Sequence, residues 1–345
     1  MLRSNDSRAN AIKELAMKYD IELTILVFEY AMREKQSIHD EQYINFYARD
    51  RLKDWRKERT YLVDKYIKQS YNDGMRGFDE DFSGTLRIPD MRRSTQMLLN
   101  ETIKPFNVGD NLILRNINDV FRKITAEKTM YFTEGIDTQR QNTQRILNAF
   151  VDRGITYFVD RANRQWDIVS YSEMASRTIF MRANVAGFIE TAYENGQNHV
   201  IVSAHANSCP LCQVWENRIL SLQADGKYPS LDEAMAGGLF HPNCGHSLAV
   251  YIEGITKQEG GFPYGHDNDD GYKTTQQQRY YERMVRKWKK RELVALDPNT
   301  KKKAKQQVRL YQNRINSLIK DYTNRTGLAL QRKYYRERIE GSSRL

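Results

Sequence analysis

Two short clusters of cysteine and histidine are the residues of this chain best suited to holding a metal ion. The first is Cys209-Pro-Leu-Cys212, and the second begins after 28 intervening residues as His241-Pro-Asn-Cys244-Gly-His246. A two-residue spacing lets both sulfurs of one tight turn face the same ion, and Zn²⁺ takes Cys and His ligands in tetrahedral geometry. We expect a zinc site on Cys209, Cys212, His241 and Cys244, with His246 as the main substitute ligand and His205 as the weakest candidate.

A site closed by protein ligands leaves no coordination position for water, so its role would be structural. It would tie two loops together and help to fold a segment with little apolar core of its own. A disulfide framework is not expected, because the three cysteines form an odd number and no secretory leader precedes them. The alternatives are reduced buried cysteines beside ordinary histidines, or a metal-site fold that has lost its ion.

Enzyme chemistry fits the same residues less well. Zinc deaminases pair His-x-Glu with Pro-Cys-x-x-Cys, whereas here Ala206 and Asn207 follow His205, and Ser208 precedes Cys209. A thioredoxin-like site would leave the second cluster without a role. We retain one enzyme alternative, a metal-supported nuclease or toxin-like enzyme acting on nucleic acid. It would need a base and an open metal position, whereas a structural site should bury its ligands and have no carboxylate or free histidine in an adjacent cleft.

The elements expected around these clusters form a small α+β region. Segments rich in β-branched residues predict short strands at 199–203, 218–222 and 247–251, and a hairpin made by 155–159 and 165–168. A helix should start with Ser170 as its cap, with Glu173 completing a capping box, and run to about residue 195. Glu173 and Arg177 lie one helical turn apart, which predicts a salt bridge on the helix face.

Helical periodicity dominates the rest of the chain. Helices are predicted at 12–30, 40–71, 91–104, 110–132 and 138–153, with Gly74, Gly77 and Gly84 interrupting the pattern after the second. Two long charged helices are predicted at 274–294 and 299–338. The fold class is therefore α+β, and we expect a helical domain at 1–150, a small α+β domain at 151–256, a Gly-rich linker at 257–272 and a basic helical tail at 273–345.

The positive charge of the chain is concentrated in this tail. The net charge is +10, but residues 273–345 hold 21 Lys and Arg against 6 Asp and Glu, a net of +15, which leaves −5 for the rest. Such asymmetry indicates a polyanion or an acidic protein surface as the partner of the tail. One hypothesis is that the tail contacts double-stranded DNA, and the alternative is that it forms a solvated charged helix. No apolar run is long enough to predict a membrane span.

The region 150–256 resembles the phage minor capsid protein 2 family, which is related to the Mu F-like head morphogenesis proteins. The segments that carry the resemblance are Val202-Ser-Ala-His205, Cys209-Pro-Leu-Cys212, Tyr228-Pro-Ser-Leu-Asp-Glu-Ala and Gly238-Leu-Phe-His241-Pro-Asn-Cys244-Gly-His246, with Trp166, Tyr171-Ser-Glu-Met174 and Arg177-Thr178 upstream. The N-terminal helices fit the family in character only, and the basic tail could be peculiar to this chain. Gly245 stands where the commoner pattern His-Pro-Asn-Cys-Arg has arginine.

This resemblance implies a non-enzymatic minor capsid protein of a tailed phage, acting in head morphogenesis. Proteins of this kind enter the procapsid in few copies, lie in the virion at the portal or inside the capsid, and contact portal, capsid or scaffolding proteins. The chain would then reside in the host cytoplasm during assembly. A basic tail would suit contact with packaged DNA, which weakens steeply with salt through counterion release. Deleting 273–345 is expected to abolish DNA binding at low salt and to leave the rest folded.

Overall fold

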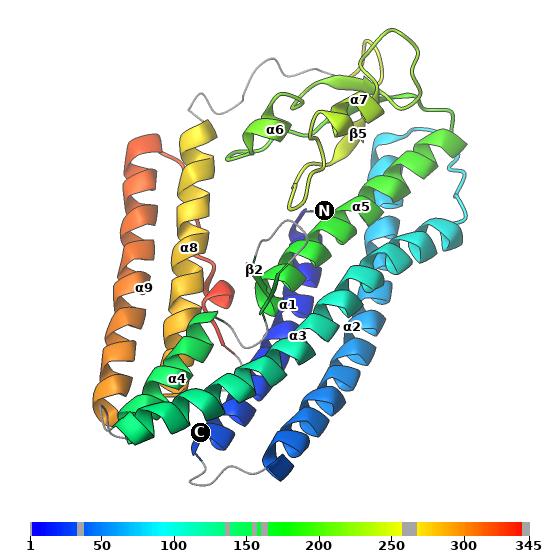
Figure 1. The fold of residues 1–345 in the computed structure, drawn as a ribbon. Coiled ribbons are helices and arrows are strands. Elements are labelled where there is room, and N and C mark those ends of the chain that lie inside the picture. Colours follow the sequence, from blue (N-terminus) through cyan, green and yellow to red (C-terminus); the bar gives the residue numbers. More distant parts are fainter. Residues whose placement is uncertain are drawn as a thin grey trace. The chain divides into compact units, whose positions relative to one another are not determined.

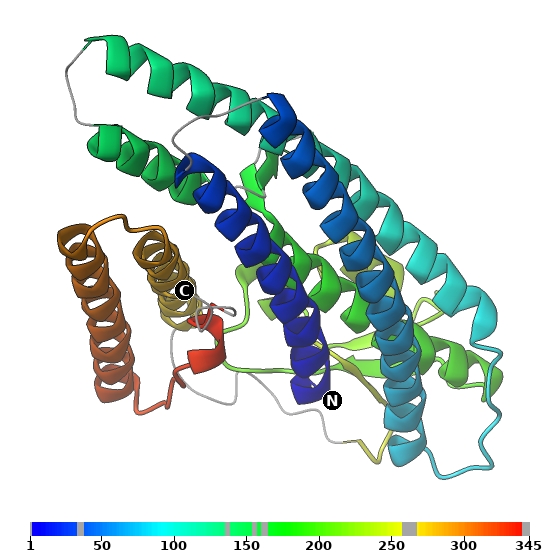
Figure 2. The same ribbon diagram turned by 90° about the horizontal axis from the view of Figure 1, so that it is seen from below.

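The computed structural model describes residues 2–32, 38–134, 139–153, 157–159, 165–256 and 268–339 (Figures 1 and 2). The chain is mostly helical, with a small antiparallel sheet, so the expected α+β class is confirmed. The helices are α1 (Leu2–Met32), α2 (Ile38–Asp81), α3 (Arg92–Glu134), α4 (Gln139–Arg153), α5 (Ile168–Glu194), α6 (Pro210–Gln213), α7 (Leu231–Ala236), α8 (Asn268–Leu293) and α9 (Pro298–Thr326), followed by a 3-10 turn at Tyr334–Arg336. The strands are β1 (Tyr157–Val159), β2 (Gln165–Asp167), β3 (His199–Val202), β4 (Ile219–Ser221) and β5 (Leu248–Val250).

Contacts group the residues into two compact units, each made of three stretches of the chain. Unit 1 comprises 1–12, 59–105 and 172–275, and unit 2 comprises 13–58, 106–171 and 276–345. The consecutive domains expected from the sequence stay a prediction, because this grouping does not test which segments fold independently. Part of the expected linker, 257–267, lies outside the described residues, and α8 begins at Asn268.

Close packing of α2 on α5 builds one part of unit 1. A β-carbon added at Gly74 would lie 1.9 Å from the carbonyl oxygen of Asn184, and one added at Gly187 would lie 2.1 Å from that of Tyr71. Only glycine lets the two backbones approach this closely. The expected break at Gly74 and Gly77 is therefore wrong: α2 continues to Asp81, because Gly74 serves helix packing.

The expected separation of two helices at 104–110 is also wrong, because α3 runs unbroken from Arg92 to Glu134 with Pro105 inside it. Proline lacks an N–H and normally kinks or ends a helix. Buried side chains on both sides of it, Leu98, Phe106 and Ile113, hold the helix in place by packing. Tertiary contacts, which the local sequence pattern does not reveal, thus offset the missing backbone hydrogen bond.

The three-stranded sheet of unit 1 has the order β4-β3-β5, and both pairings are antiparallel. His199 pairs with Ser221 at one end of β3, and Val202 pairs with Leu248 at the other. Pairing of Val202 with Leu248 places the chain that leaves β3 beside the chain that enters β5. Both stretches lead directly to the cysteine and histidine clusters, so the register of the sheet is what brings the clusters together.

The predicted hairpin forms as β1 and β2, with Phe158 opposite Trp166. The helix after it starts earlier than expected. α5 begins at Ile168, and the carboxylate of Asp167 accepts a hydrogen bond from the Ser170 N–H at 3.0 Å. Asp167 therefore caps the helix, so the assignment of Ser170 as the cap is wrong. The predicted salt bridge between Glu173 and Arg177 is confirmed at 3.1 Å.

Helices α8 and α9 run side by side in unit 2 (Figures 1 and 2). Val285 of α8 packs with Val308 and Ile315 of α9. Asp297 caps the start of α9, where its side chain accepts the Thr300 N–H, and Gly327 ends the helix in a left-handed conformation with φ of 72°. The prediction that this helix extends to residue 338 is wrong, because Gly327 provides a stop signal that the charge pattern hides.

Candidate metal centre

The first cluster is a helical turn that opens with a cysteine. Cys209 is the N-cap residue of α6, and Pro210 occupies the first helical position, where its missing N–H costs nothing. The Cys212 N–H bonds to the Cys209 carbonyl at 3.1 Å and closes the turn. Cys212 is fully buried, whereas Cys209 is partly exposed. The turn therefore presents two sulfurs on one side.

The second cluster lies in the loop before β5. The Cys244 N–H bonds to the His241 carbonyl at 2.9 Å, and Asn243 adopts a left-handed conformation with φ of 68°. Asparagine tolerates this region better than most residues, so His-Pro-Asn-Cys suits a tight turn. Cys244 is only 4% exposed and belongs to the same apolar core as Cys212.

The structure places the four expected ligands in two overlapping groups that share Cys212: Cys209, Cys212 and His241 form one, and Cys212, Cys244 and His246 form the other. Cys209 Sγ lies 2.8 Å from His241 Nε2, and Cys212 Sγ lies 3.5 Å from Cys244 Sγ. The candidate ligand atoms of Cys209, Cys212 and His241 all lie within 4.8 Å of one another. Zinc–ligand lengths of about 2.0–2.3 Å imply ligand-to-ligand distances of roughly 3.3–3.8 Å in a tetrahedron. The sulfur pair matches this range, and Cys209 and His241 would separate slightly around an ion.

Hydrogen bonding shifts the pKa values of Cys244 and Cys212 in opposite directions, so Cys244 is the more readily ionised of the two ligands. Hydrogen bonds from Cys212 and from His246 together lower the pKa of Cys244 to about 4, against the effect of burial. The same pairing raises the pKa of Cys212, as does burial. The Nδ1–H of His241 donates to the Pro242 carbonyl at 2.7 Å, which leaves Nε2 unprotonated and facing Cys209. Such an outer hydrogen bond is typical of metal-ligating histidines.

His246 lies between the cysteine site and a second group of polar side chains. Its Nδ1 is 3.3 Å from Cys244 Sγ, and its Nε2 is 2.8 Å from Glu216 Oε1. The ring of His205 packs on that of His246 with centroids 4.3 Å apart. Burial alone would lower the pKa of His246, but Cys244 and Glu216 raise it. Of the two substitute ligands expected from the sequence, His246 therefore lies in one group with Cys212 and Cys244, and His205 contacts this group through the ring of His246.

Glu216 is the residue of this site that sequence reasoning missed. Its side chain is 4% exposed, and it accepts hydrogen bonds from the His205 backbone N–H at 3.2 Å and from His246. It follows Cys212 by four residues in a stretch with no metal-ligand pattern. The one sequence feature that could have indicated Glu216 is that it is a carboxylate close to a cluster of cysteine and histidine. It lies against the site as a buried group, where the structural hypothesis expected no neighbouring carboxylate.

Comparison with known proteins identifies the family. The sequence profile of phage minor capsid protein 2 matches residues 52–320. The chain belongs to the phage minor capsid protein 2 family. It is 26% identical over 280 residues to a structural protein of Lactococcus phage LL-H, covering 76% of this chain and 68% of that protein. It is 34% identical over 119 residues to a structural protein of Lactococcus phage mv4, covering 33% of this chain and 93% of that protein.

The minor capsid protein 2 match extends well beyond the segments that suggested it. It includes most of α2, all of α3 and α4, α8 and most of α9, so the tail is not peculiar to this chain as far as residue 320. No solved structure matches the chain significantly. Among the described residues, no helix is both long and apolar enough to span a bilayer.

Proposed function

We propose that this chain is a minor structural component of a tailed-phage head, incorporated near the portal during assembly, and that α9 contacts packaged DNA. The match to the phage minor capsid protein 2 family over residues 52–320 carries the first part of this proposal. The two relatives named structural proteins of phages support a place in the virion. The position near the portal, with portal, capsid or scaffolding proteins as partners, follows from the family resemblance.

The charge distribution of α9 supports the DNA contact. Helix α9 contains eight Lys and Arg but only one acidic residue, Asp321. Its buried residues Ala304, Val308, Ile315 and Tyr322 form one apolar stripe. The basic side chains are all exposed: Lys301, Lys302, Lys303, Lys305, Arg309, Arg314, Lys320 and Arg325. One face of the helix is therefore packed and the other presents positive charge to solvent, as phosphate binding requires.

Basic residues near the end of α8 pair with carboxylates of other helices in unit 2. Lys290 bonds to the buried Asp20, and Arg291 Nε lies 2.8 Å from Asp152. Val294, next to the end of α8, packs with Leu147 of α4. Deleting 273–345 would thus remove part of the core of unit 2, and the expectation that the rest stays folded is not supported. Substitution within α9 is the cleaner experiment.

Replacing Lys301, Lys302 and Lys303 together by glutamine should weaken binding to double-stranded DNA. The slope of log K against log salt is negative, and each lost phosphate contact reduces its magnitude by about 0.9, so the magnitude should decrease by about 2.7 if all three make contact. The matched control replaces the exposed α2 residues Lys53, Lys57 and Lys65 by glutamine. Filter binding over a salt series measures both. Equal losses in the two variants, or none in the first, would reject the assignment of α9.

The position near the portal is tested in procapsids. Cross-linking mass spectrometry of particles assembled with this chain should give cross-links between its exposed lysines and the portal protein. Cross-links confined to the major capsid protein would reject this part of the proposal and leave the family assignment intact.

A structural zinc ion on Cys209, Cys212, His241 and Cys244 is part of the proposed function. Support comes from the contacts of Cys209 with His241 and of Cys212 with Cys244, the lowered pKa of Cys244 and the hydrogen bond of His241 Nδ1 to the Pro242 carbonyl. The ion would hold the loop after β3 to the loop before β5. These loops flank the sheet, so the ion would stabilise the part of unit 1 that carries the family resemblance.

One observation favours a second candidate, a metal-supported nuclease: a carboxylate, Glu216, lies against His246. The two side chains are 4% and 1% exposed, which opposes direct access by DNA. We expect no nicking of supercoiled plasmid in the presence of Zn²⁺ or Mg²⁺. Nicking that disappears in Glu216→Gln would establish the enzyme and overturn the purely structural role.

A further inference from the structure

We propose that His205, Glu216 and His246 form a second cation site, separate from the cysteine site and suited to Zn²⁺. Their candidate ligand atoms all lie within 4.8 Å of one another. Two imidazole nitrogens and one carboxylate oxygen are ligands that Zn²⁺ accepts together, with a further position left for water. The site uses no cysteine, so it can be filled independently of the site on Cys209, Cys212, His241 and Cys244.

Two buried atoms in this group have no hydrogen-bond partner among the residues that the structure describes: Nε2 of His205 and Oε2 of Glu216. Buried polar atoms are nearly always paired, so such atoms need a physical explanation. Both belong to side chains of the same three-residue group, and the Glu216 side chain is 4% exposed. A cation bound between them would satisfy both atoms at once.

The hydrogen bonds around the group leave a lone pair on His205 and place a proton between His246 and Glu216. A carbonyl oxygen can only accept, so the 3.2 Å contact of His205 Nδ1 with the Ala206 carbonyl makes Nδ1 the protonated nitrogen. Nε2 of His205 then carries a lone pair. Nε2 of His246 lies 2.8 Å from Glu216 Oε1 and donates its proton to that oxygen, so a bound cation would take the place of this proton, while Nδ1 stays 3.3 Å from Cys244 Sγ. Outer partners that fix the tautomer in this way are typical of histidine ligands.

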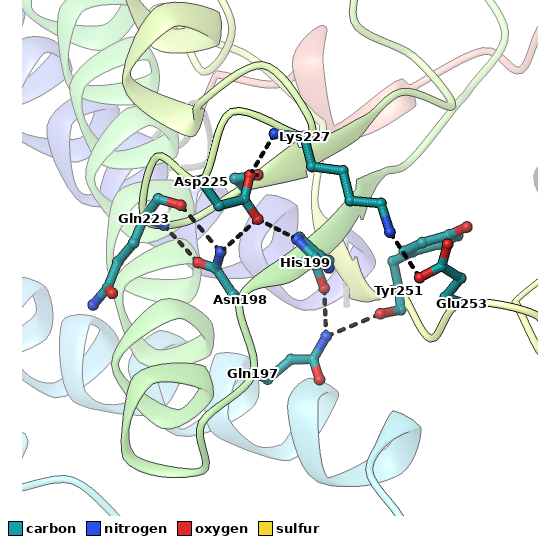
Figure 3. Close-up of polar contacts among 9 residues, drawn as sticks. Gln197, Asn198, His199, Gln223, Asp225, Lys227, Tyr251 and Glu253 are labelled. Carbon is teal, nitrogen blue, oxygen red and sulfur yellow. Dashed lines mark hydrogen bonds and ion pairs between the residues drawn. The ribbon is translucent and has the colours of Figure 1, made fainter.

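A second histidine–carboxylate pair in unit 1 shows what a pair without a cation site looks like (Figure 3). His199 Nε2 lies 2.5 Å from Asp225 Oδ2, on the exposed side of β3. Asn198 also donates to Oδ2 of Asp225, and Ser221 and the Lys227 N–H donate to Oδ1. Both oxygens of Asp225 are thus hydrogen-bonded by protein groups, in contrast to Oε2 of Glu216.

The experiment counts Zn²⁺ bound to the purified full-length chain after dialysis, by elemental analysis against protein concentration. Wild type should hold two equivalents, and Glu216→Gln, which keeps shape but removes the charge, should hold one. Cys209→Ser should also hold one. His199→Asn is the matched control and should hold two. His205→Asn, at a less buried residue, provides an independent variant that should hold one if Glu216→Gln fails to fold.

Cobalt substitution separates the two sites. Co²⁺ on thiolates gives an intense charge-transfer absorption that a site of nitrogen and oxygen ligands lacks. Glu216→Gln should keep this absorption and lose one equivalent, whereas Cys209→Ser should weaken the absorption and keep the other equivalent. One equivalent in wild type, or full stoichiometry in both Glu216→Gln and His205→Asn, would overturn the second site. Glu216 would then be an outer partner of His246, and the proposed phage function would be unaffected.

Discussion

Zinc should raise the thermal stability of unit 1 by an amount that depends on Cys209. Cys212 and Cys244 lie in the apolar core beside the sheet, so unfolding of unit 1 would also dismantle the cysteine site. Cys209 is the suitable residue to change, because it is partly exposed and its sulfur contributes less packing than the two buried ones. Wild type and Cys209→Ser are therefore both treated with a chelator to remove bound metal and are then titrated with Zn²⁺.

The expected size follows from linkage between binding and folding. A ligand that binds only the folded state adds about 2.7 kcal/mol of stability when its free concentration is 100 times Kd. For a unit of roughly 150–250 residues, each kcal/mol raises Tm by about 2–4 °C. Zinc at this excess should therefore raise the Tm of the chelated protein by about 5–11 °C. Loss of one ligand in Cys209→Ser should remove the share of this increase that the cysteine site provides and leave the share that comes from the site on His205, Glu216 and His246.

Differential scanning calorimetry with a zinc series measures the shift, and circular dichroism at 20 °C checks that each variant is folded before heating. His199→Asn, at the exposed pair with Asp225, should retain the full shift. A wild-type Tm that does not change with zinc would refute the cysteine site. An equal shift in Cys209→Ser would show that zinc stabilises the protein through other residues.

Three further predictions concern packing and charge. Gly187→Ala should destabilise unit 1 by about 1–3 kcal/mol in urea unfolding, because the new β-carbon would lie 2.1 Å from the Tyr71 carbonyl oxygen; an unchanged midpoint would contradict it. Lys290→Met should cost about 3–5 kcal/mol by removing the cation that faces the buried carboxylate of Asp20, and adding Asp20→Asn should recover part of the loss. Burial would raise the pKa of Asp167, but the cation of Lys290 and further partners lower it overall. Asp167 therefore stabilises the fold above its ordinary pKa of about 3.9 and loses this effect as pH falls, so Asp167→Asn should flatten the acid side of the stability curve.

The sequence predicted best those elements whose signals are local. The strands around the clusters, the hairpin and the pair Glu173–Arg177 follow from residue types and spacing over a few positions, and all are present. The breaks expected near Gly74 and Pro105 are absent, because the deciding contacts come from distant segments. Gly74 meets Asn184 on α5, a contact that no local pattern in α2 could reveal.

The candidate site shows the same limit. The spacing of Cys-x-x-Cys and His-x-x-Cys predicted the cysteine site, and the pairing of Val202 with Leu248 explains why the two clusters lie close together. Glu216 was missed because a carboxylate is common in any sequence. Its burial beside His246 is a property of the folded loop. The sequence shows that the tail is basic. The structure was needed to show that Lys290 and Arg291 on α8 pair with carboxylates, whereas the basic side chains of α9 are exposed.

The composition of mature particles is the most direct test of the phage head assignment. Quantitative mass spectrometry of purified, nuclease-treated virions, with the portal protein as internal reference, gives the copy number of this chain. We predict that it is present in intact heads in few copies relative to the major capsid protein. Expression in infected cells together with absence from both procapsids and virions would contradict the account.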